Sequence, residues 1–228
     1  MNVLIIGATF GIGHELAKKY ANSSDTLVLL GRTEAKLEEF KKEFADRKAK
    51  IITDNLDVTI ATQCAEKISN ILKICPIINK VIYCSGYYQP HNTFEIDLAL
   101  FKKTMDVNFM GMINVFSVLL PHLKNQNHGH LGIVASLAGF GGLPNSSSYG
   151  PSKAAMMNYA ESIKIDCDKY NIKVSVINPG FVQSRLTEKN TFDMPFLMSA
   201  EKAASIIYDG LEKGEIRDNF PFSNDGLI

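Results

Sequence analysis

The stretch Val3-Leu-Ile-Ile6-Gly7-Ala-Thr-Phe-Gly11-Ile-Gly13 joins a short apolar run to a glycine-rich turn. In the residues that follow, Leu16 and Ala17 fall on the same side as Ile12 when the segment is drawn as a helix. The stretch therefore predicts a strand, a tight turn and a helix, in that order. Glycines in such a turn let the backbone approach a ligand closely, and the helix presents free N–H groups to a phosphate.

This turn has two interpretations. It is either a plain strand-to-helix connection, since glycine-rich loops are common, or a dinucleotide site. Its position between a predicted strand and a predicted helix favours the dinucleotide site. The residues of the turn expected to contact that ligand are Gly7, Thr9, Phe10, Gly11, Ile12 and Gly13.

Further short apolar runs alternate with helical patterns along the chain. These predicted strands are 26–30, 50–53, 80–84, 131–135 and 173–177. The alternation predicts a Rossmann-type α/β fold, a doubly wound parallel sheet with right-handed crossovers and helices on both faces. No linker, repeat or low-complexity tract interrupts the pattern, so one domain spanning residues 1–228 is expected.

Composition narrows the class of partner. The chain has 24 Lys and Arg against 24 Asp and Glu, a formal net charge of +0, so neither nucleic acid nor an anionic membrane is an expected partner. The N-terminal apolar run breaks at Gly7 and no apolar run has the length of a membrane span, so neither a signal peptide nor a membrane segment is expected. The 4 cysteines form no CxxC pair, which is typical of a cytoplasmic protein, and the 5 histidines show no metal-ligand spacing, so no metal is expected.

Two residues at predicted strand ends bear on the choice of nucleotide. An acidic residue after the second strand would bind the ribose 2′-hydroxyl of NAD, but Arg32 stands there. A guanidinium suits a 2′-phosphate, so Arg32 favours NADP(H) over NAD(H), unless it is only a solvated side chain. Asp57 either accepts a hydrogen bond from adenine or caps the helix that begins near Thr59, which competes for that capping role. Gly86, after the fourth strand, would let the backbone pass close to the nucleotide.

The stretch from Ser136 to Lys153 has the spacing of an acid–base site. Tyr149 and Lys153, at positions i and i+4, would lie on one face of a helix, where the ammonium would lower the pKa of the phenol. Ser136 closes the fifth predicted strand. Asn108 lies within the helical pattern 97–123, at an expected kink, and a bond to backbone or a bound water would satisfy its amide.

Together these residues resemble the short-chain dehydrogenase/reductase family. The residues that match its cofactor loop, adenine pair, catalytic four and nicotinamide-side loop are Gly7, Gly11, Gly13, Asp57, Val58, Asn108, Ser136, Tyr149, Lys153, Pro179 and Gly180. The family's usual Asn-Asn-Ala-Gly is Tyr83-Cys84-Ser85-Gly86 here, and Ser184 stands where a Thr is usual. Beside these, Ser85 and Val182 are expected to line the cofactor site.

The resemblance implies an NADP(H)-dependent oxidoreductase that acts on a carbonyl or secondary alcohol. Tyr149 would exchange a proton with the substrate oxygen, and Ser136 would hydrogen-bond that oxygen. Lys153 would hold the ribose and tune Tyr149, while Asn108 would hold a water. The resemblance also implies a homodimer through the helices 108–124 and 149–170.

An apolar segment at about 185–199 is expected to form a lid over the substrate. The side chains expected to wall the substrate pocket are Tyr87, Leu137, Phe140, Leu143, Phe181 and Phe192. They favour an apolar or aromatic substrate. The alternative function is a protein that binds NADP(H) as a regulator or scaffold without catalysis, which the altered 83–86 motif favours and the intact catalytic four oppose.

Overall fold

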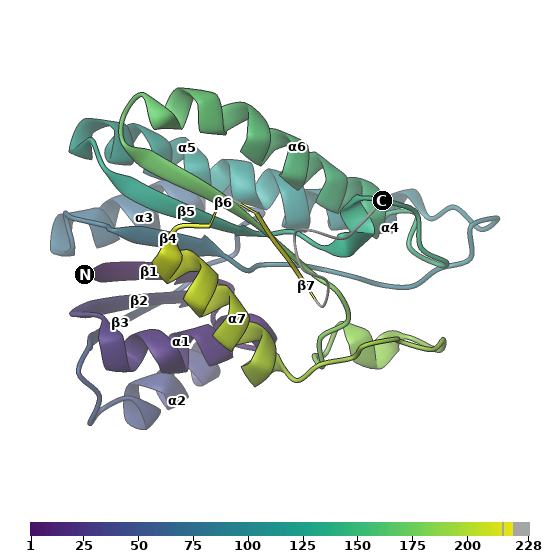
Figure 1. Ribbon diagram of the computed structural model, residues 1–228, viewed down its shortest axis with the longest axis horizontal. Helices are drawn as coiled ribbons and strands as arrows, with labels where there is room; N and C mark the ends of the chain where they lie inside the picture. The colour runs from purple at the N-terminus through teal and green to yellow at the C-terminus, as the bar shows by residue number, and fades with distance from the viewer. Residues whose placement is uncertain (216, 221–228) are drawn as a thin grey trace.

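A single parallel sheet forms the centre of the computed structural model, which describes residues 1–215 and 217–220 (Figure 1). The strands are β1 (Asn2–Ile6), β2 (Thr26–Gly31), β3 (Lys50–Asn55), β4 (Lys80–Tyr83), β5 (Gly129–Val134), β6 (Ile172–Pro179) and β7 (Arg217–Phe220). Their order across the sheet is β3-β2-β1-β4-β5-β6-β7, and every neighbouring pair runs parallel. The predicted doubly wound α/β fold is confirmed, and β7 is a short strand in the C-terminal stretch, where the sequence suggested one without fixing its bounds.

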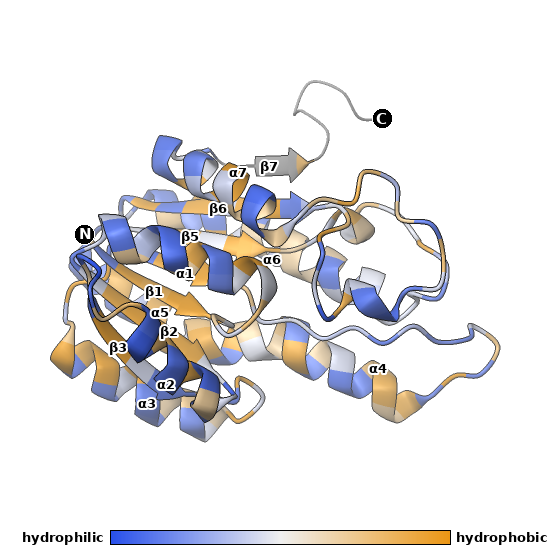
Figure 2. Ribbon diagram, turned by 90° about the horizontal axis from the view of Figure 1, so that it is seen from below, coloured by the Kyte–Doolittle hydropathy of each residue, from blue (hydrophilic) through white to orange (hydrophobic). Residues whose placement is uncertain are grey.

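Helices cover both faces of this sheet (Figure 1). On one face lie α1 (Gly11–Ser23), α2 (Glu34–Glu43) and α7 (Ala200–Lys213). On the other lie α3 (Ala61–Ile74), α4 (Leu98–Met105), α5 (Gly111–Gln126) and α6 (Tyr149–Asp168). Figure 2 shows the apolar strands at the centre and the hydrophilic outer surfaces of α1 and α2.

The core consists of two apolar clusters because successive side chains of a strand point to opposite faces of the sheet. In β1, Leu4 and Ile6 pack with α3, α5 and α6, whereas Val3 and Ile5 pack with α1, α2 and α7. All four side chains are buried. A strand covered on both faces reads as a continuous apolar run, which is why β1 is visible in the sequence.

The topology places a crevice at the carboxyl ends of β1 and β4. The chain winds from β1 to β2 and β3 on one side, then returns to β4 on the other side of β1. Ligands of doubly wound sheets bind at such a switch point. The glycine-rich turn that follows β1 and the 83–86 motif that ends β4 therefore meet there.

The predicted kink near Asn108 is a π-helical segment, Asp106–Met110, between α4 and α5. The residues around it leave no room for a side chain at Gly111, where a Cβ would lie 2.6 Å from Cγ2 of Val58 and 2.9 Å from the Tyr83 hydroxyl. The π segment thus turns Asn108 into the interior, directly behind the carboxyl end of β4.

By length and composition alone, the helical stretch Leu98–Gln126 could cross a membrane, so the expectation that no apolar segment would qualify was wrong. Its apolar residues have another use in this structure. Met112, Val115, Phe116 and Leu119 of α5 are buried against the sheet and its neighbouring helices. The buried apolar side chains of α5 are therefore part of the protein core.

Candidate active site

Two cavities meet at the carboxyl ends of the strands. The larger has a volume of about 500 Å³ and reaches from the glycine-rich turn to the end of β6. The smaller has a volume of about 230 Å³ and lies between the loop after β5 and the segment after β6. Ser136 and Tyr149 line both cavities. A group bound in one cavity would therefore meet a group bound in the other at these two hydroxyls.

Every residue that the sequence assigned to the cofactor lines the larger cavity. These residues are Gly7, Thr9, Phe10, Gly11, Ile12, Gly13, Arg32, Asp57, Val58, Ser85, Gly86, Tyr149, Lys153, Pro179, Gly180, Val182 and Ser184. They come from segments far apart in the chain, and the parallel sheet brings them together because each follows the end of a strand or begins a helix.

The glycine-rich turn is a cradle that side chains would fill. Gly7 has φ +85°, and a Cβ there would lie 2.6 Å from the Ser85 nitrogen. A Cβ at Gly13 would lie 2.2 Å from the Gly7 oxygen. Phe10 precedes α1 without a side-chain cap, and the first turn of α1 has no acidic residue. Backbone N–H groups at this positive helix end fit a dinucleotide's phosphates.

Arg32 and Asp57 line the far end of the larger cavity. Asp57 does not cap α3, which begins at Ala61, because its Oδ1 accepts hydrogen bonds from the nitrogen (2.9 Å) and hydroxyl (2.7 Å) of Thr59. Burial tends to raise the pKa of Asp57, but the Thr59 hydrogen bonds and the nearby Arg32 charge leave that pKa below its usual value. The capping interpretation of Asp57 is therefore wrong, and an ionised carboxylate faces this end of the cavity.

Ser136, Tyr149 and Lys153 gather where β5 ends and α6 begins. Tyr149 is the first residue of α6, and the Lys153 Nζ lies 5.6 Å from the centre of the Tyr149 ring. Lys153 is buried and donates a hydrogen bond of 3.0 Å to the Val134 carbonyl. Burial lowers the pKa of Lys153 to about 8, although the neighbouring Cys84 opposes this shift.

The pKa of Tyr149 differs from the sequence expectation. We expected the Lys153 ammonium to lower it, but burial raises the pKa of the phenol to about 12, with Ser136 lowering it by a hydrogen bond and Tyr88 raising it. Burial prevails because it disfavours the charged phenolate, and the Lys153 ammonium is directed to a backbone carbonyl. In this structure Tyr149 holds its proton at neutral pH.

Asn108 lies behind the site and lines neither cavity. It is fully buried, and its Oδ1 accepts a hydrogen bond of 2.6 Å from the Tyr87 nitrogen. Its Nδ2 donates to the Tyr87 carbonyl (3.0 Å) and to the Ser152 hydroxyl (2.8 Å). Asn108 thus joins the loop after β4 to α6. Of the two ways expected to satisfy its amide, the structure shows the hydrogen bonds to backbone.

Tyr83, in the altered 83–86 motif, is held in place by contacts with the π segment and with α5. The Tyr83 hydroxyl donates a hydrogen bond of 2.9 Å to the Val107 carbonyl in the π segment, and its ring packs edge-on against Phe116. A phenol therefore ties β4 to the π segment where the family's motif has an amide. The Cys84 thiol lines the larger cavity, and burial raises its pKa to about 12.

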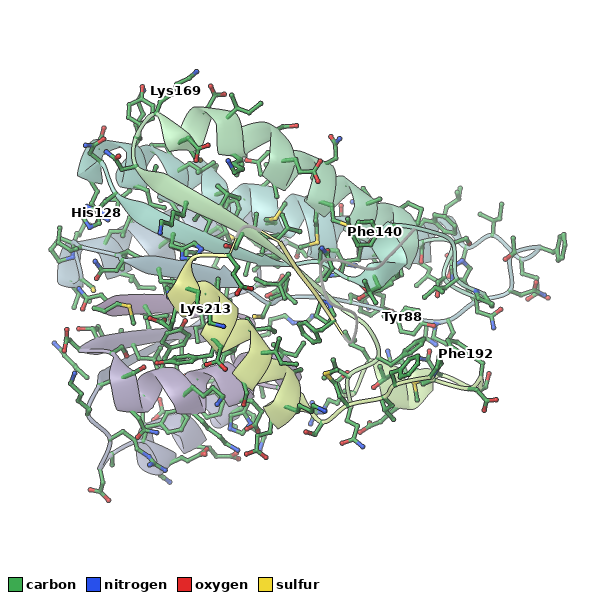
Figure 3. The ribbon with its side chains drawn as sticks, viewed as in Figure 1. Tyr88, His128, Phe140, Lys169, Phe192 and Lys213 are labelled. Atoms are coloured by element: carbon green, nitrogen blue, oxygen red, sulfur yellow. The ribbon has the colours of Figure 1, made fainter. Side chains whose placement is uncertain are left out.

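The smaller cavity is lined by four of the six residues expected to wall a substrate pocket, and two of the expected positions need correction. The expected residues that line it are Leu137, Leu143, Phe181 and Phe192. Tyr87 lines the larger cavity instead, and Tyr88 takes its place, packed edge-on against Tyr149 with ring centres 5.1 Å apart. Neighbouring residues of an extended segment point in opposite directions, so one tyrosine faces each cavity. Figure 3 shows Tyr88 and Phe192 at the same end of the molecule.

Phe140 is the second correction. It lines neither cavity and is 42% exposed. It follows the 3₁₀ turn Leu137–Gly139, which directs Leu137 toward the smaller cavity and carries Phe140 beyond it.

Two cations of the expected lid were not predicted to line a cavity. Arg185 and Lys189 both line the larger cavity. The Arg185 guanidinium lies 3.4 Å from the centre of the Phe10 ring, and Lys189 donates a hydrogen bond of 2.8 Å to the Tyr88 carbonyl. Both follow Ser184 closely, so basic residues just after this position are the signal that could have found them.

A doubly wound sheet, a glycine cradle and a Ser–Tyr–Lys group with a buried lysine define the class as a nucleotide-binding α/β enzyme. A family model described as short chain dehydrogenase matches residues 1–194. An uncharacterized oxidoreductase of Myxococcus xanthus is 31% identical over 219 residues, covering 96% of this chain and 87% of that protein. The chain belongs to the short-chain dehydrogenase family, as its motifs predicted, and is an oxidoreductase of that family.

Solved structures share the fold. A short-chain dehydrogenase from Sphingobium yanoikuyae in complex with NADPH has a TM-score of 0.89 at 18% identity, covering 99% of this chain and 90% of that chain. ElxO with NADP bound has a TM-score of 0.83 at 23% identity, covering 91% of this chain and 90% of its own. At these identities the likeness establishes the shared architecture.

Proposed function

We propose that this oxidoreductase uses NADP(H) to interconvert a carbonyl compound and a secondary alcohol, with Tyr149 as the acid and base. The observation that carries the proposal is the position of Ser136 and Tyr149 between the two cavities. The larger cavity has the glycine cradle of a dinucleotide site. The NADPH and NADP of the two solved neighbours support a nicotinamide cofactor.

The nicotinamide, when bound, supplies or accepts the hydride. Tyr149 carries the proton, since burial keeps its hydroxyl neutral at physiological pH. In the reducing direction Tyr149 gives this proton to the substrate oxygen as negative charge develops there. Ser136 donates a hydrogen bond to the same oxygen, which fixes its position and stabilises the developing charge.

Lys153 and Asn108 support that proton transfer. One N–H of the Lys153 ammonium is used by Val134, which leaves donors for the ribose hydroxyls of the cofactor. Its charge also stabilises the Tyr149 phenolate that proton transfer leaves behind. Asn108 positions the loop that carries Tyr87 and Tyr88 by its hydrogen bonds to the Tyr87 backbone.

Arg32 supports a preference for NADP(H). Its exposed side chain lines the end of the larger cavity, where its charge would meet a 2′-phosphate. NADPH and NADH oxidation, measured side by side against a panel of carbonyl compounds, tests this choice. Saturation by NADH but not by NADPH would overturn the role of Arg32.

Tyr149→Phe tests the mechanism. The variant should lower turnover by at least about 100-fold, the lower end of general acid–base effects, while NADPH binding stays nearly unchanged. Tyr159→Phe is the matched control, because Tyr159 lies on the same helix and packs against Phe109 and Phe116 away from both cavities. Turnover retained in Tyr149→Phe would exclude Tyr149 as the acid.

A regulator or scaffold without catalysis is the competing proposal. The altered 83–86 motif is the feature that favours it. The Tyr83–Val107 hydrogen bond weakens that argument, because the substituted motif still braces β4 against the π segment.

A further inference from the structure

We infer that the substrate is an uncharged ketone, or the matching alcohol, with a single aromatic ring or an equally compact apolar body. The inference rests on the proposed function and concerns the smaller cavity. It comes from the chemistry of the cavity wall, from the place of its few polar groups, and from its volume.

The wall of the smaller cavity is apolar and rich in aromatic rings. Its apolar residues come from the loop after β5 and from the segment after β6: Leu137, Leu143, Phe181, Phe192, Pro195 and Phe196. The rings of Phe181 and Phe192 pack edge-on, with centres 5.9 Å apart. Among the described residues that line this cavity, no side chain is charged.

Most polar groups at the cavity already have partners within the protein. The Tyr88 hydroxyl donates to Oδ1 of Asn190 at 2.9 Å, and the Thr187 hydroxyl donates to the Val182 carbonyl at 2.7 Å. The Ser146 hydroxyl donates to the Pro144 carbonyl at 3.1 Å. The Ser136 hydroxyl accepts from the Ala138 nitrogen at 3.2 Å and donates to the Pro179 carbonyl only at the long distance of 3.5 Å. It lies with the Tyr149 hydroxyl at the junction with the larger cavity, and these two hydroxyls are the groups that can turn to a polar atom of the ligand. One oxygen of the substrate is thus recognised, and it lies at one end.

The two nearby cations, Lys189 and Arg185, contact other groups and do not line the smaller cavity. Lys189 donates to the Tyr88 carbonyl at 2.8 Å and to Oε1 of Gln89 at 3.1 Å, and Arg185 stacks on Phe10 in the larger cavity. A carboxylate or phosphate on the substrate would therefore lose its water without gaining a partner. Burial of an unpaired charge is strongly unfavourable, so the cavity selects against charged substrates.

The volume of the smaller cavity limits the size of the apolar part of the substrate. An apolar cavity of about 150 Å³ holds benzene. A cavity of about 230 Å³ therefore holds a benzene ring with a short substituent beside the reacting carbonyl. Leu143, at 40% exposure, stands where the cavity meets solvent.

The test compares two ketones of similar shape and different charge, 4-methylacetophenone and 4-acetylbenzoate, with saturating NADPH. We expect kcat/KM for the neutral ketone to exceed that for the carboxylate by roughly 100-fold. This ratio corresponds to the free-energy cost of burying a charge without a partner. Binding of each ketone to the complex with NADP⁺, which cannot reduce it, is measured by calorimetry as a second readout.

Two arginine variants test whether the smaller cavity causes this selection. Leu143→Arg places a cation on the cavity wall and should lower the KM for 4-acetylbenzoate at least tenfold. Ile77→Arg is the matched control, since Ile77 is also partly exposed, at 46%, but lies just before β4 and lines neither cavity. It should leave the ratio of the two ketones unchanged.

The outcomes separate this inference from the proposed function. Equal kcat/KM values for the two ketones, or an equal effect of both arginine variants, would overturn the inference alone. NADPH binding without binding or reduction of either ketone would also overturn it, while reduction of another carbonyl compound would preserve the proposed function. Failure of both NADPH and NADH to bind would remove the proposed function and the inference with it.

Discussion

At Tyr149 and Lys153, burial favours the neutral form of both side chains. It raises the pKa of the phenol to about 12 and lowers the pKa of the ammonium to about 8. The sequence predicted that the Lys153 ammonium would lower the pKa of the Tyr149 phenol. Instead Tyr149 holds its proton over the whole physiological range, which suits the proposed reduction, and Lys153 is the group that titrates near neutrality.

The first residue-scale prediction concerns that titration. As pH rises through about 8, Lys153 loses its charge, so the affinity for NADPH should fall. We expect the affinity for NADPH to decrease roughly tenfold between pH 7 and pH 9.5, which corresponds to the free energy of one charge-assisted hydrogen bond. NADPH fluorescence titrations measure it, with Lys153→Met as the variant that should bind weakly at every pH. A pH-independent affinity in the unmodified protein would contradict the role of Lys153.

At the scale of elements, the turn between β1 and α1 is the most crowded part of the site. Gly13→Ala would place a Cβ 2.2 Å from the Gly7 oxygen, so the turn must open. We expect a loss of about 2 kcal/mol in the free energy of unfolding, typical of overpacking, and at least tenfold weaker NADPH binding. Urea denaturation and NADPH titration measure the two effects.

Gly141→Ala is the control for this substitution. A Cβ at Gly141 would meet no atom within 4 Å, so the variant should keep the stability and affinity of the parent. If both alanine variants behaved alike, the crowding at Gly13 would not be the cause.

A second element-scale prediction concerns the opposite end of the sheet, where β5 and β6 begin. Nε2 of buried His130 lies 2.7 Å from the Ser175 hydroxyl. Burial first, and then the charges of Lys80 and Lys173, lower the pKa of His130 from 6.5 to about 4. The unfolded chain therefore takes up a proton at higher pH than the folded protein does. Stability from this residue is complete above about pH 6.5 and is lost as pH falls through about 4.

The free energy of unfolding should fall by about 3 kcal/mol at pH 4, which follows from the size of the His130 pKa shift. Urea denaturation at several pH values measures it in the protein and in His130→Gln. The variant should lose less stability than the parent between pH 7 and pH 4.5, because carboxylates contribute equally to both. Identical pH profiles would show that His130 is not the responsible group.

At the scale of the whole molecule, the loop after β4 and the segment after β6 are joined across the site. Tyr88 bonds Asn190, and Lys189 bonds the Tyr88 carbonyl, so the two segments that project at the carboxyl edge in Figure 1 are connected. We propose that residues 185–199 form a lid, and that these two contacts hold it over the smaller cavity.

The homodimer through the helices 108–124 and 149–170 stays a prediction. Ile165, on the outer side of α6, is 69% exposed, and an apolar side chain of this kind would be covered by a second copy. Light scattering after gel filtration should give twice the mass of 25.2 kDa for the parent. Ile165→Glu should give the monomer with unchanged thermal stability, and a monomeric parent would exclude the dimer.

Much of the fold was predictable because buried parallel strands read as apolar runs. The run at β1 and the turn after it predicted both an element and the site at its end. The residues assigned to the cofactor were predictable for a related reason: they lie at or near strand ends, where the topology of a doubly wound sheet places ligands. The order of Ser136, Tyr149 and Lys153 predicted a common site because i and i+4 share a helix face.

The amino-acid sequence by itself determined the sheet, the crevice at its carboxyl edge and the grouping of Ser136, Tyr149 and Lys153, since these depend on local periodicity and on spacing along the chain. Only the tertiary structure decided that Tyr88 rather than Tyr87 faces the smaller cavity, that Phe140 lies outside it, and that Arg185 reaches Phe10. It also decided the direction in which the pKa of Tyr149 shifts. Orientation and burial depend on contacts between segments far apart in the chain, and no local pattern records how much water such contacts remove.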